Sequence, residues 1–199
     1  MAMGTHIPEE EILMDILTKL PVKSLFRFKC VSKSWKTLFS KPYFKKKHLN
    51  HAKNQTDSQK LLIGASSSGK TDFNFYCTSL SPNRLLVNDI HKVFWQSISE
   101  PFSGCKVYCC CDALFLIEIW TGLSRDEPSM ILLWNPTTSE SVVLPRLESS
   151  LEHEYTYGLG YDSTSDNYKV LRIDKEGDAL DEILALKSGS WREICSPSK

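Results

Sequence analysis

The stretch "IPEEEILMDILTKLPVKSLFRFKCVSKSWKTLFSKPYF", residues 7–44, determines the fold class of the first part of this chain. Pro8 and the three glutamates after it suit the first turn of a helix, because carboxylates complement the positive end of the helix dipole. Pro21 ends that helix, since proline lacks a backbone N–H and restricts the residue before it. Between the two prolines, apolar residues recur at helical spacing and form one stripe: Ile12, Leu13, Ile16, Leu17 and Leu20.

Two more short helices are expected after Pro21. The second carries Val22, Leu25 and Phe26, and the third follows Ser32 as its N-cap and closes at Lys41-Pro42. Three helices of this size make a small core that usually needs support from another surface. The apolar residues exceed what the helices can bury among themselves. The surplus either packs on the downstream part of the chain or is offered to a partner protein, and the residues alone leave both open.

The segment "LLIGASSSGKT", residues 61–71, raises the possibility of nucleotide binding. Gly64, Gly69, Lys70 and Thr71 fit the phosphate-loop pattern. Such a loop works only when a helix follows it, because the helix N-terminus helps to hold the phosphates. The residues after Thr71 instead alternate between apolar and polar types, as a strand does. A P-loop nucleotide hydrolase is therefore the disfavoured alternative, and we interpret the segment as a strand, a Ser/Gly hairpin turn and a second strand.

The chain beyond the polar stretch 51–60 has a β pattern, with short apolar runs between turn signals. The expected turns are Ser81-Pro82-Asn83, Asn135-Pro136, Gly158-Leu159-Gly160 and Ser188-Gly189. A strand–turn–strand unit recurs after about 50 residues, first at 131–145 and again at 182–197, with a looser copy at 75–89. A period near 50 is typical of kelch-like propeller blades.

Charge divides the chain at the same place. Residues 1–53 contain eleven Lys and Arg and four Asp and Glu, whereas the remainder contains thirteen Lys and Arg and twenty Asp and Glu. The net charge of zero is therefore the sum of a basic first part and an acidic second part. Such asymmetry indicates two parts with different partners. The basic residues form no recognition-helix or stacking motif, and an acidic protein partner explains their charge as well as a nucleic acid does; we expect no nucleic acid.

Cysteines and histidines suggest no metal site. Cys105 and the run 109–111 lack a second ligand pair, and neighbouring residues of a strand point to opposite faces, so we interpret these cysteines as small buried apolar residues. His48 and His51 have no evident third ligand and are expected at the surface. The odd total of seven cysteines and the lack of a signal-like N-terminus favour a reducing, intracellular location, in the cytoplasm, the nucleus or both, without membrane insertion.

The first 50 residues resemble an F-box of the large plant class. The resemblance rests on Ile7-Pro8 in place of the usual Leu-Pro, on Ile16-Leu17, on Leu20-Pro21-Val22-Lys23-Ser24-Leu25, and on Cys30-Val31-Ser32-Lys33 with Trp35. It implies three domain segments: an F-box at 5–50, a linker at 51–60 and a β domain at 61–199. The fold class is then α+β, with a three-helix F-box before a mostly antiparallel β domain.

The β part resembles the F-box-associated domain of plant S-locus F-box and F-box/kelch-like proteins. The segments that carry the resemblance are 132–145, 157–173 and 182–194. Members often have Cys-Asn-Gly-Leu where this chain has Cys111-Asp112-Ala113-Leu114, so the turn glycine is lost. Members usually run longer as well, and we expect an incomplete domain that is part of a kelch-like propeller.

The resemblance implies a substrate-recognition subunit of an SCF-type (cullin-RING) ubiquitin ligase. Such a subunit has no catalytic residue, cofactor or metal of its own; it binds a Skp-type adaptor, and through it the cullin and RING subunits, and presents a target protein whose identity the sequence does not give. The residues expected to form the adaptor interface and its support are Ile7, Pro8, Ile12, Ile16, Leu17, Leu20, Pro21, Leu25, Val31 and Trp35.

Overall fold

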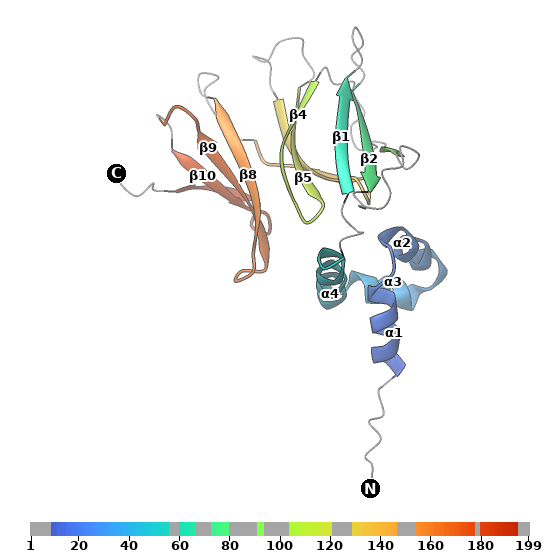
Figure 1. The fold of residues 1–199 in the computed structure, drawn as a ribbon. Helices are drawn as coiled ribbons and strands as arrows, with labels where there is room; N and C mark the ends of the chain where they lie inside the picture. Colours follow the sequence, from blue (N-terminus) through green and yellow to red (C-terminus); the bar gives the residue numbers. More distant parts are fainter. Residues whose placement is uncertain are drawn as a thin grey trace. The chain divides into compact units, whose positions relative to one another are not determined.

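The α+β class is confirmed by the structure, a computed structural model (Figure 1). It describes residues 9–55, 60–66, 73–79, 91–93, 104–120, 129–146, 154–177 and 180–194. The chain divides into two compact units. The first unit comprises Met1–Leu62 with Cys77–His91, and the second comprises Ile63–Tyr76 with Lys92–Lys199.

Among its described residues, the first unit contains four helices where the sequence pattern predicted three. They are α1 (Glu9–Thr18), α2 (Val22–Val31), α3 (Lys33–Ser40) and α4 (Pro42–Lys53). Pro42 closes α3 as expected but also opens α4, because proline fits the first helical position, where no N–H donor is needed. The helix α4 therefore takes in residues 51–53 of the expected linker, and residues 56–59 of it lie outside the described residues.

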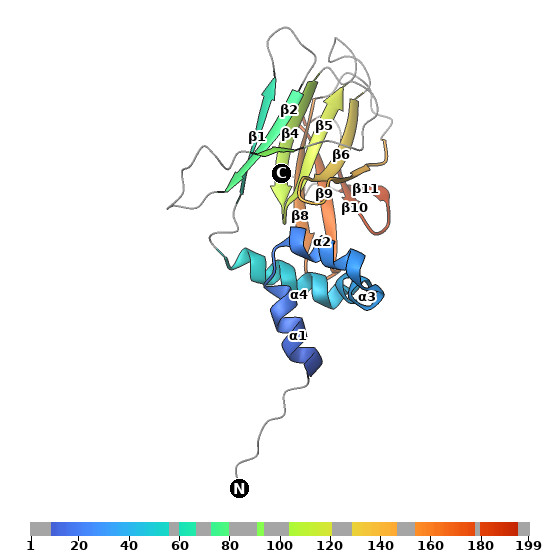
Figure 2. The ribbon, with the colours of Figure 1, turned by 90° about the vertical axis from the view of Figure 1, so that its right-hand side faces the viewer.

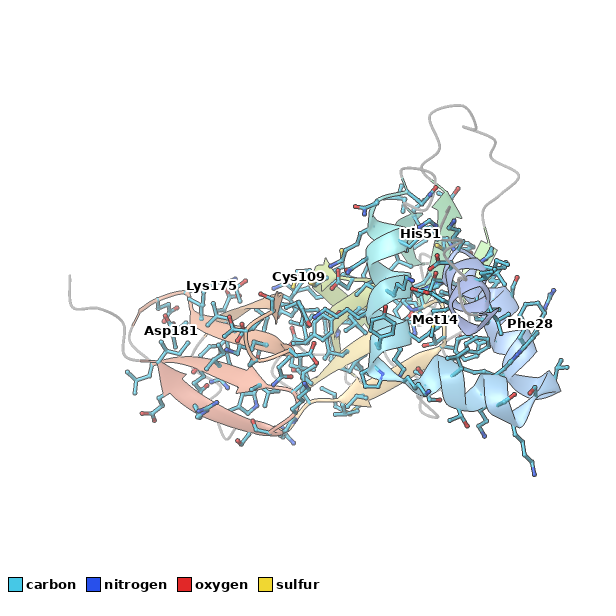
Figure 3. The ribbon with its side chains drawn as sticks, turned by 90° about the horizontal axis from the view of Figure 1, so that it is seen from below. Met14, Phe28, His51, Cys109, Lys175 and Asp181 are labelled. Atoms are coloured by element: carbon cyan, nitrogen blue, oxygen red, sulfur yellow. The ribbon has the colours of Figure 1, made fainter. Side chains whose placement is uncertain are left out.

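The four helices share one small apolar core. Its buried members are Leu17, Leu25, Phe39 and Phe44, one from each helix. Half-buried apolar side chains pack around them, including Met14 of α1 and Phe28 of α2, which are labelled in Figure 3. Each helix therefore contributes one buried apolar residue to the core, and this packing, more than intrinsic helix propensity, stabilises such short helices.

The described residues of the β part form three antiparallel sheets of consecutive strands. The first holds β1 (Lys60–Ser66), β2 (Phe73–Ser79) and β3 (His91–Val93). The second, which we call the central sheet, and the third, which we call the last sheet, have four strands each. The central sheet holds β4 (Gly104–Cys111), β5 (Leu114–Trp120), β6 (Ser129–Asn135) and β7 (Glu140–Val143). The last sheet holds β8 (Tyr155–Asp162), β9 (Asn167–Asp174), β10 (Asp181–Ala185) and β11 (Ser190–Ile194).

Two of the four expected turns are confirmed and one is wrong. The turns at Asn135-Pro136 and Ser188-Gly189 join β6 to β7 and β10 to β11. Gly158-Leu159-Gly160 instead lies inside β8, paired with β9 along its length. Ser81-Pro82-Asn83 falls outside the described residues.

The segment 61–71 begins as the expected strand. Gly64, predicted in the turn, is part of β1, while Gly69, Lys70 and Thr71 lie outside the described residues. The next described element is the strand β2, where a phosphate-binding loop would be followed by a helix. The structure therefore contradicts the P-loop alternative.

The central sheet is apolar on both faces, and each face packs against a different sheet (Figures 1 and 2). On one face, the fully buried Trp134 of β6 meets Phe75 of β2, with ring centroids 4.9 Å apart. On the other face, Leu116 and Leu133 form a buried cluster with Val170 and Leu184 of the last sheet. Strand alternation separates Leu133 from Trp134, so adjacent residues serve two interfaces.

The turn between β4 and β5 departs from ideal residue chemistry. Asp112 and Ala113 link the paired residues Cys111 and Leu114 with φ values of 54° and 64°. A two-residue hairpin turn with two positive φ angles is the type that favours Asn-Gly, because a Cβ in this region is strained.

Replacing Ala113 with glycine should raise the free energy of unfolding by about 1 kcal/mol, since the relief of left-handed strain exceeds the entropy that glycine adds to the unfolded chain. Chemical denaturation followed by tryptophan fluorescence measures the change. The control is Ala185→Gly, at a buried β10 position without positive φ, which should lower stability. A loss of stability in Ala113→Gly would contradict the assigned turn.

Candidate functional site

Helix α1 carries apolar residues on more of its circumference than the core can cover. Leu17 is 3% exposed and lies in the core of the helical unit. One turn apart on the same helix, Ile12 and Ile16 are 47% and 55% exposed, and Leu13 beside them is 38% exposed. Three large aliphatic side chains therefore stand in solvent on one short helix, which is typical of a surface that another protein covers.

Polar contacts from α4 fix the position of α1. Lys47 forms an ion pair with Asp15, and this contact lowers the pKa of the Asp15 carboxyl and raises the pKa of the Lys47 ammonium. His48 donates from Nε2 to the backbone carbonyl of Leu20 at 2.9 Å. Leu20 follows the end of α1, where carbonyl groups lack helical partners, so this bond satisfies an otherwise open acceptor.

His48 is therefore more than the surface residue that the sequence suggested. It is half-buried, and its ring lies nearly parallel to that of Phe44, with centroids 6.3 Å apart. Phe44 belongs to a series of aromatic contacts in the core. The ring centroids of Phe28 and Trp35 are 5.2 Å apart, and Trp35 also contacts Phe39. The ring centroids of Phe39 and Phe44 are 5.0 Å apart. These ring contacts link α2, α3 and α4, and Phe39 and Phe44 share the core with Leu17 of α1.

The structure describes eight of the ten predicted interface residues, and these eight differ in burial. Ile12, Ile16, Pro21 and Val31 are exposed, and Val31 reaches 77% exposure. Leu20 and Trp35 are half-buried against the core, and Leu17 and Leu25 belong to it. Ile7 and Pro8 lie outside the described residues.

The predicted set omitted Leu13 and Phe26, which are exposed apolar residues of α1 and α2. Leu13 lies beside Ile12 on α1, and Phe26 of α2 is 37% exposed, with the ammonium of Lys29 4.5 Å from its ring centroid. The signal for Leu13 was present in the sequence, because Leu13 and Leu17 form one helical row and Ile12 and Ile16 a second. The two rows together form an apolar face on α1 that is too wide for the small core of the four helices to bury completely.

No group of three or more metal-ligating side chains gathers within the described residues. The cysteines of β4 are less buried than expected: Cys110 is exposed, while Cys105, Cys109 and Cys111 are half-buried. Burial raises the pKa of Cys105 to about 12, so its thiol stays protonated at ordinary pH. In the described part of the chain, no helix has the length and apolar character needed to cross a membrane.

A polar and aromatic seam joins the central and last sheets beside their shared apolar cluster. Glu118 of β5 accepts hydrogen bonds from Tyr108 at 2.5 Å and from Ser129 at 2.6 Å. The ring of Tyr108 meets the ring of Tyr157 of β8 edge-on, with centroids 4.9 Å apart. Farther along the last sheet, the buried Arg172 guanidinium lies 3.6 Å from the ring centroid of Tyr155.

Burial dominates the titration of the tyrosines in this seam. It raises the pKa of Tyr157 to about 12, and burial together with the hydrogen bond to Glu118 raises the pKa of Tyr108. Tyr168 of β9, which donates to Asp112 at 2.8 Å, has a raised pKa because of burial and that hydrogen bond. All three phenols stay protonated in the fold at pH values where they ionise in the unfolded chain, near pH 10.

Leu17→Ala should lower the free energy of unfolding of the helical unit by about 2–5 kcal/mol, because it opens a cavity in the core. Its helical neighbour provides the matched comparison: Ile16→Ala should change stability by less than about 0.5 kcal/mol, since Ile16 is exposed. Urea titration followed by helical circular dichroism measures both. Equal losses would contradict the separation between core and surface on α1.

Stability of the β part should fall as pH rises above about 10. The unfolded chain then releases phenolic protons that Tyr108 and Tyr157 retain in the fold. Because rising pH favours the state that binds fewer protons, it stabilises the unfolded state relative to the folded one. The urea midpoint measured between pH 8 and about 11 should decline, and Tyr157→Phe should reduce the slope because it removes one of these protons. An unchanged slope in Tyr157→Phe would show that this phenol ionises alike in both states.

Two family models match the chain. The F-box domain model matches residues 6–47, and the model described as an F-box associated beta propeller domain matches residues 60–199. No solved structure matches the chain.

Relatives from Arabidopsis thaliana match across most of the chain. The F-box protein At1g53790 is 31% identical over 94% of this chain and 42% of its own length. The F-box protein At2g15640 is 30% identical over 94% of this chain and 46% of its own length. The F-box/kelch-repeat protein At3g23880 is 31% identical over 82% of this chain and 44% of its own length.

The chain thus spans a little under half the length of the curated relatives it matches. The two family matches follow one another along the chain, as do the four helices and the antiparallel sheets. The chain belongs to the F-box proteins that carry an F-box-associated β-propeller domain.

Proposed function

We propose that the chain is a non-catalytic substrate receptor of an SCF-type ubiquitin ligase, acting in the cytoplasm or the nucleus. The helical unit binds a Skp-type adaptor, which connects it to the cullin and RING subunits. The β domain binds a target protein and holds it near the ubiquitin-loaded enzyme. Its contribution to ubiquitination is proximity, because tethering raises the effective concentration of the target's lysines.

The exposed aliphatic residues of α1 carry this proposal. Ile12, Leu13 and Ile16 are exposed on a helix that packs on the core of its unit, and this preorganisation reduces the entropy cost of binding a partner through them. Fully desolvated aliphatic anchors at the centre of an interface can contribute roughly 2 kcal/mol or more each. Pro21 and Val31 extend the set of exposed residues that the adaptor would cover.

Charge supports an acidic partner for the helical unit. Residues 1–53 hold eleven Lys and Arg against four Asp and Glu, and their field attracts an acidic surface. Such complementarity accelerates encounter and orients the partners more than it adds affinity. The β domain, with thirteen basic and twenty acidic residues after Lys53, would repel the same surface, which favours docking through the helices.

The full chain co-expressed with a Skp-type adaptor should elute as a stable complex. Ile16→Asp should weaken adaptor binding by about 30-fold, since about 2 kcal/mol of apolar contact is lost and a charge is buried. Isothermal calorimetry with purified adaptor measures the loss.

The control is Tyr43→Asp, at an aromatic residue of α4 that is 66% exposed and lies outside the proposed interface. This variant should bind as the unchanged chain does. Absence of any complex with the unchanged chain, or equal losses in the two variants, would overturn adaptor docking through α1.

A further inference from the structure

We propose that β7, the strand at one edge of the central sheet, binds an extended segment of the target protein as an added antiparallel strand. The segment has β-branched side chains on both of its faces. The inference rests on the proposed function only in assigning this segment to the target, because the binding edge belongs to the β domain and involves no residue of the helical unit.

The outer edge of β7 offers backbone groups for such pairing. Among the described strands, β6 is the strand that pairs with β7, and it does so on one side. The N–H of Leu144 donates to the carbonyl of Ile131 at 2.8 Å, so residues 144 and 142 direct their backbone groups toward β6. Because these directions alternate along an antiparallel strand, Ser141 and Val143 direct their N–H and C=O groups away from the sheet. An extended backbone is the kind of partner that satisfies groups at alternate positions.

The side chains on this edge are apolar and exposed. Val142 is 63% exposed and Val143 is 55% exposed. Neighbouring residues of a strand point to opposite faces, so the two valines leave apolar surface on both sides of the edge. Since β-branched residues pack well against each other across paired strands, an added strand that carries them covers both valines.

The strand β11 has the same place in the last sheet that β7 has in the central sheet. Asn135 pairs with Glu140 across the turn from β6 to β7, and Ala185 pairs with Ser190 across the turn from β10 to β11. Four residues lie between the paired residues in each turn, so the two strands correspond residue by residue. Both are terminal strands of their four-stranded sheets.

The two edges differ in the residues that they expose. Counted from the turns, Val142 and Val143 correspond to Arg192 and Glu193 of β11, which are both exposed. Charged side chains on an edge strand prevent its pairing with other chains, because pairing would bury the charges. The last sheet has this protection at two positions where the central sheet has valines, which indicates that β7 is an edge open to an added strand.

Charges at the two ends of β7 determine the direction of the added strand. Glu140 begins the strand, Arg146 follows its end, and both are exposed. A segment antiparallel to β7 places its C-terminal end beside Glu140 and its N-terminal end beside Arg146. A basic residue at the C-terminal end and an acidic residue at the N-terminal end then complement both charges. Pro145 has no N–H to donate, so the added strand pairs along residues 140–144.

Fluorescence anisotropy of a labelled synthetic peptide tests the proposal on the full chain. The probe is Glu-Val-Thr-Val-Thr-Val-Lys with blocked termini, which has the expected end charges and β-branched side chains on both faces. It should bind the unchanged chain. The same peptide with N-methyl groups on its five central residues retains every side chain but lacks the N–H donors, and it should bind at least tenfold more weakly.

The double variant Val142→Arg with Val143→Glu places the residues of β11 on β7. It should bind the probe at least tenfold more weakly, with unchanged circular dichroism and urea midpoint, because both valines are exposed. The control Val107→Arg, at an exposed valine of β4 in the same sheet, should bind the probe as the unchanged chain does. Adaptor binding by the double variant should equal that of the unchanged chain, so this test is separate from the test of adaptor docking.

Amide hydrogen exchange gives a readout that non-specific adhesion would not produce. When the probe binds, the N–H groups of Ser141 and Val143 should exchange at least tenfold more slowly, whereas those of Val142 and Leu144, already directed to β6, should not change. Absence of probe binding by the unchanged chain would overturn the proposal. So would equal binding by the double variant, or binding that leaves the exchange of Ser141 and Val143 unaltered.

Discussion

A sheet that is apolar on both faces must be covered twice, and the central sheet imposes this requirement on the β domain. Its β5 and β6 strands place Trp134 on one face and Leu133 on the other, and both are nearly inaccessible to solvent. Leaving either face in water would forfeit roughly 25 cal/mol for each Å² of apolar surface. The first and last sheets are therefore necessary neighbours of the central one.

The helical unit, by contrast, leaves part of its apolar surface exposed. Among the described residues its core holds one buried apolar residue from each helix, and the extra aliphatic residues of α1 stay outside. The ion pair between Lys47 and Asp15 and the bond from His48 to Leu20 hold α1 where its outer row remains available. On α1, the buried Leu17 therefore contributes to stability, whereas the exposed Ile12 and Ile16 are available for binding.

How much the sequence predicts depends on whether the deciding contact is local. The turns at Asn135-Pro136 and Ser188-Gly189 follow from residue types alone and were confirmed. Gly158 and Gly160 carried the same kind of signal, but pairing with β9 keeps them in a strand, where glycine opens a depression. The roles of Ile16 and Leu17 could not be separated, because both suit a helix and only the packing of the other helices decides which one is buried. His48 was misjudged for the same reason, since its partner is 28 residues away.

The order of the strands bears on how the chain matures. Each four-stranded sheet pairs only consecutive strands, so nearly all of its pairings are short in sequence. Low contact order favours rapid folding, and domains fold as the ribosome releases them from the N-terminus. The central sheet can therefore form before β8 has been synthesised, but its Leu116 and Leu133 then face solvent until the last sheet arrives. During translation this interval is the period in which a chaperone would have most reason to bind the growing chain.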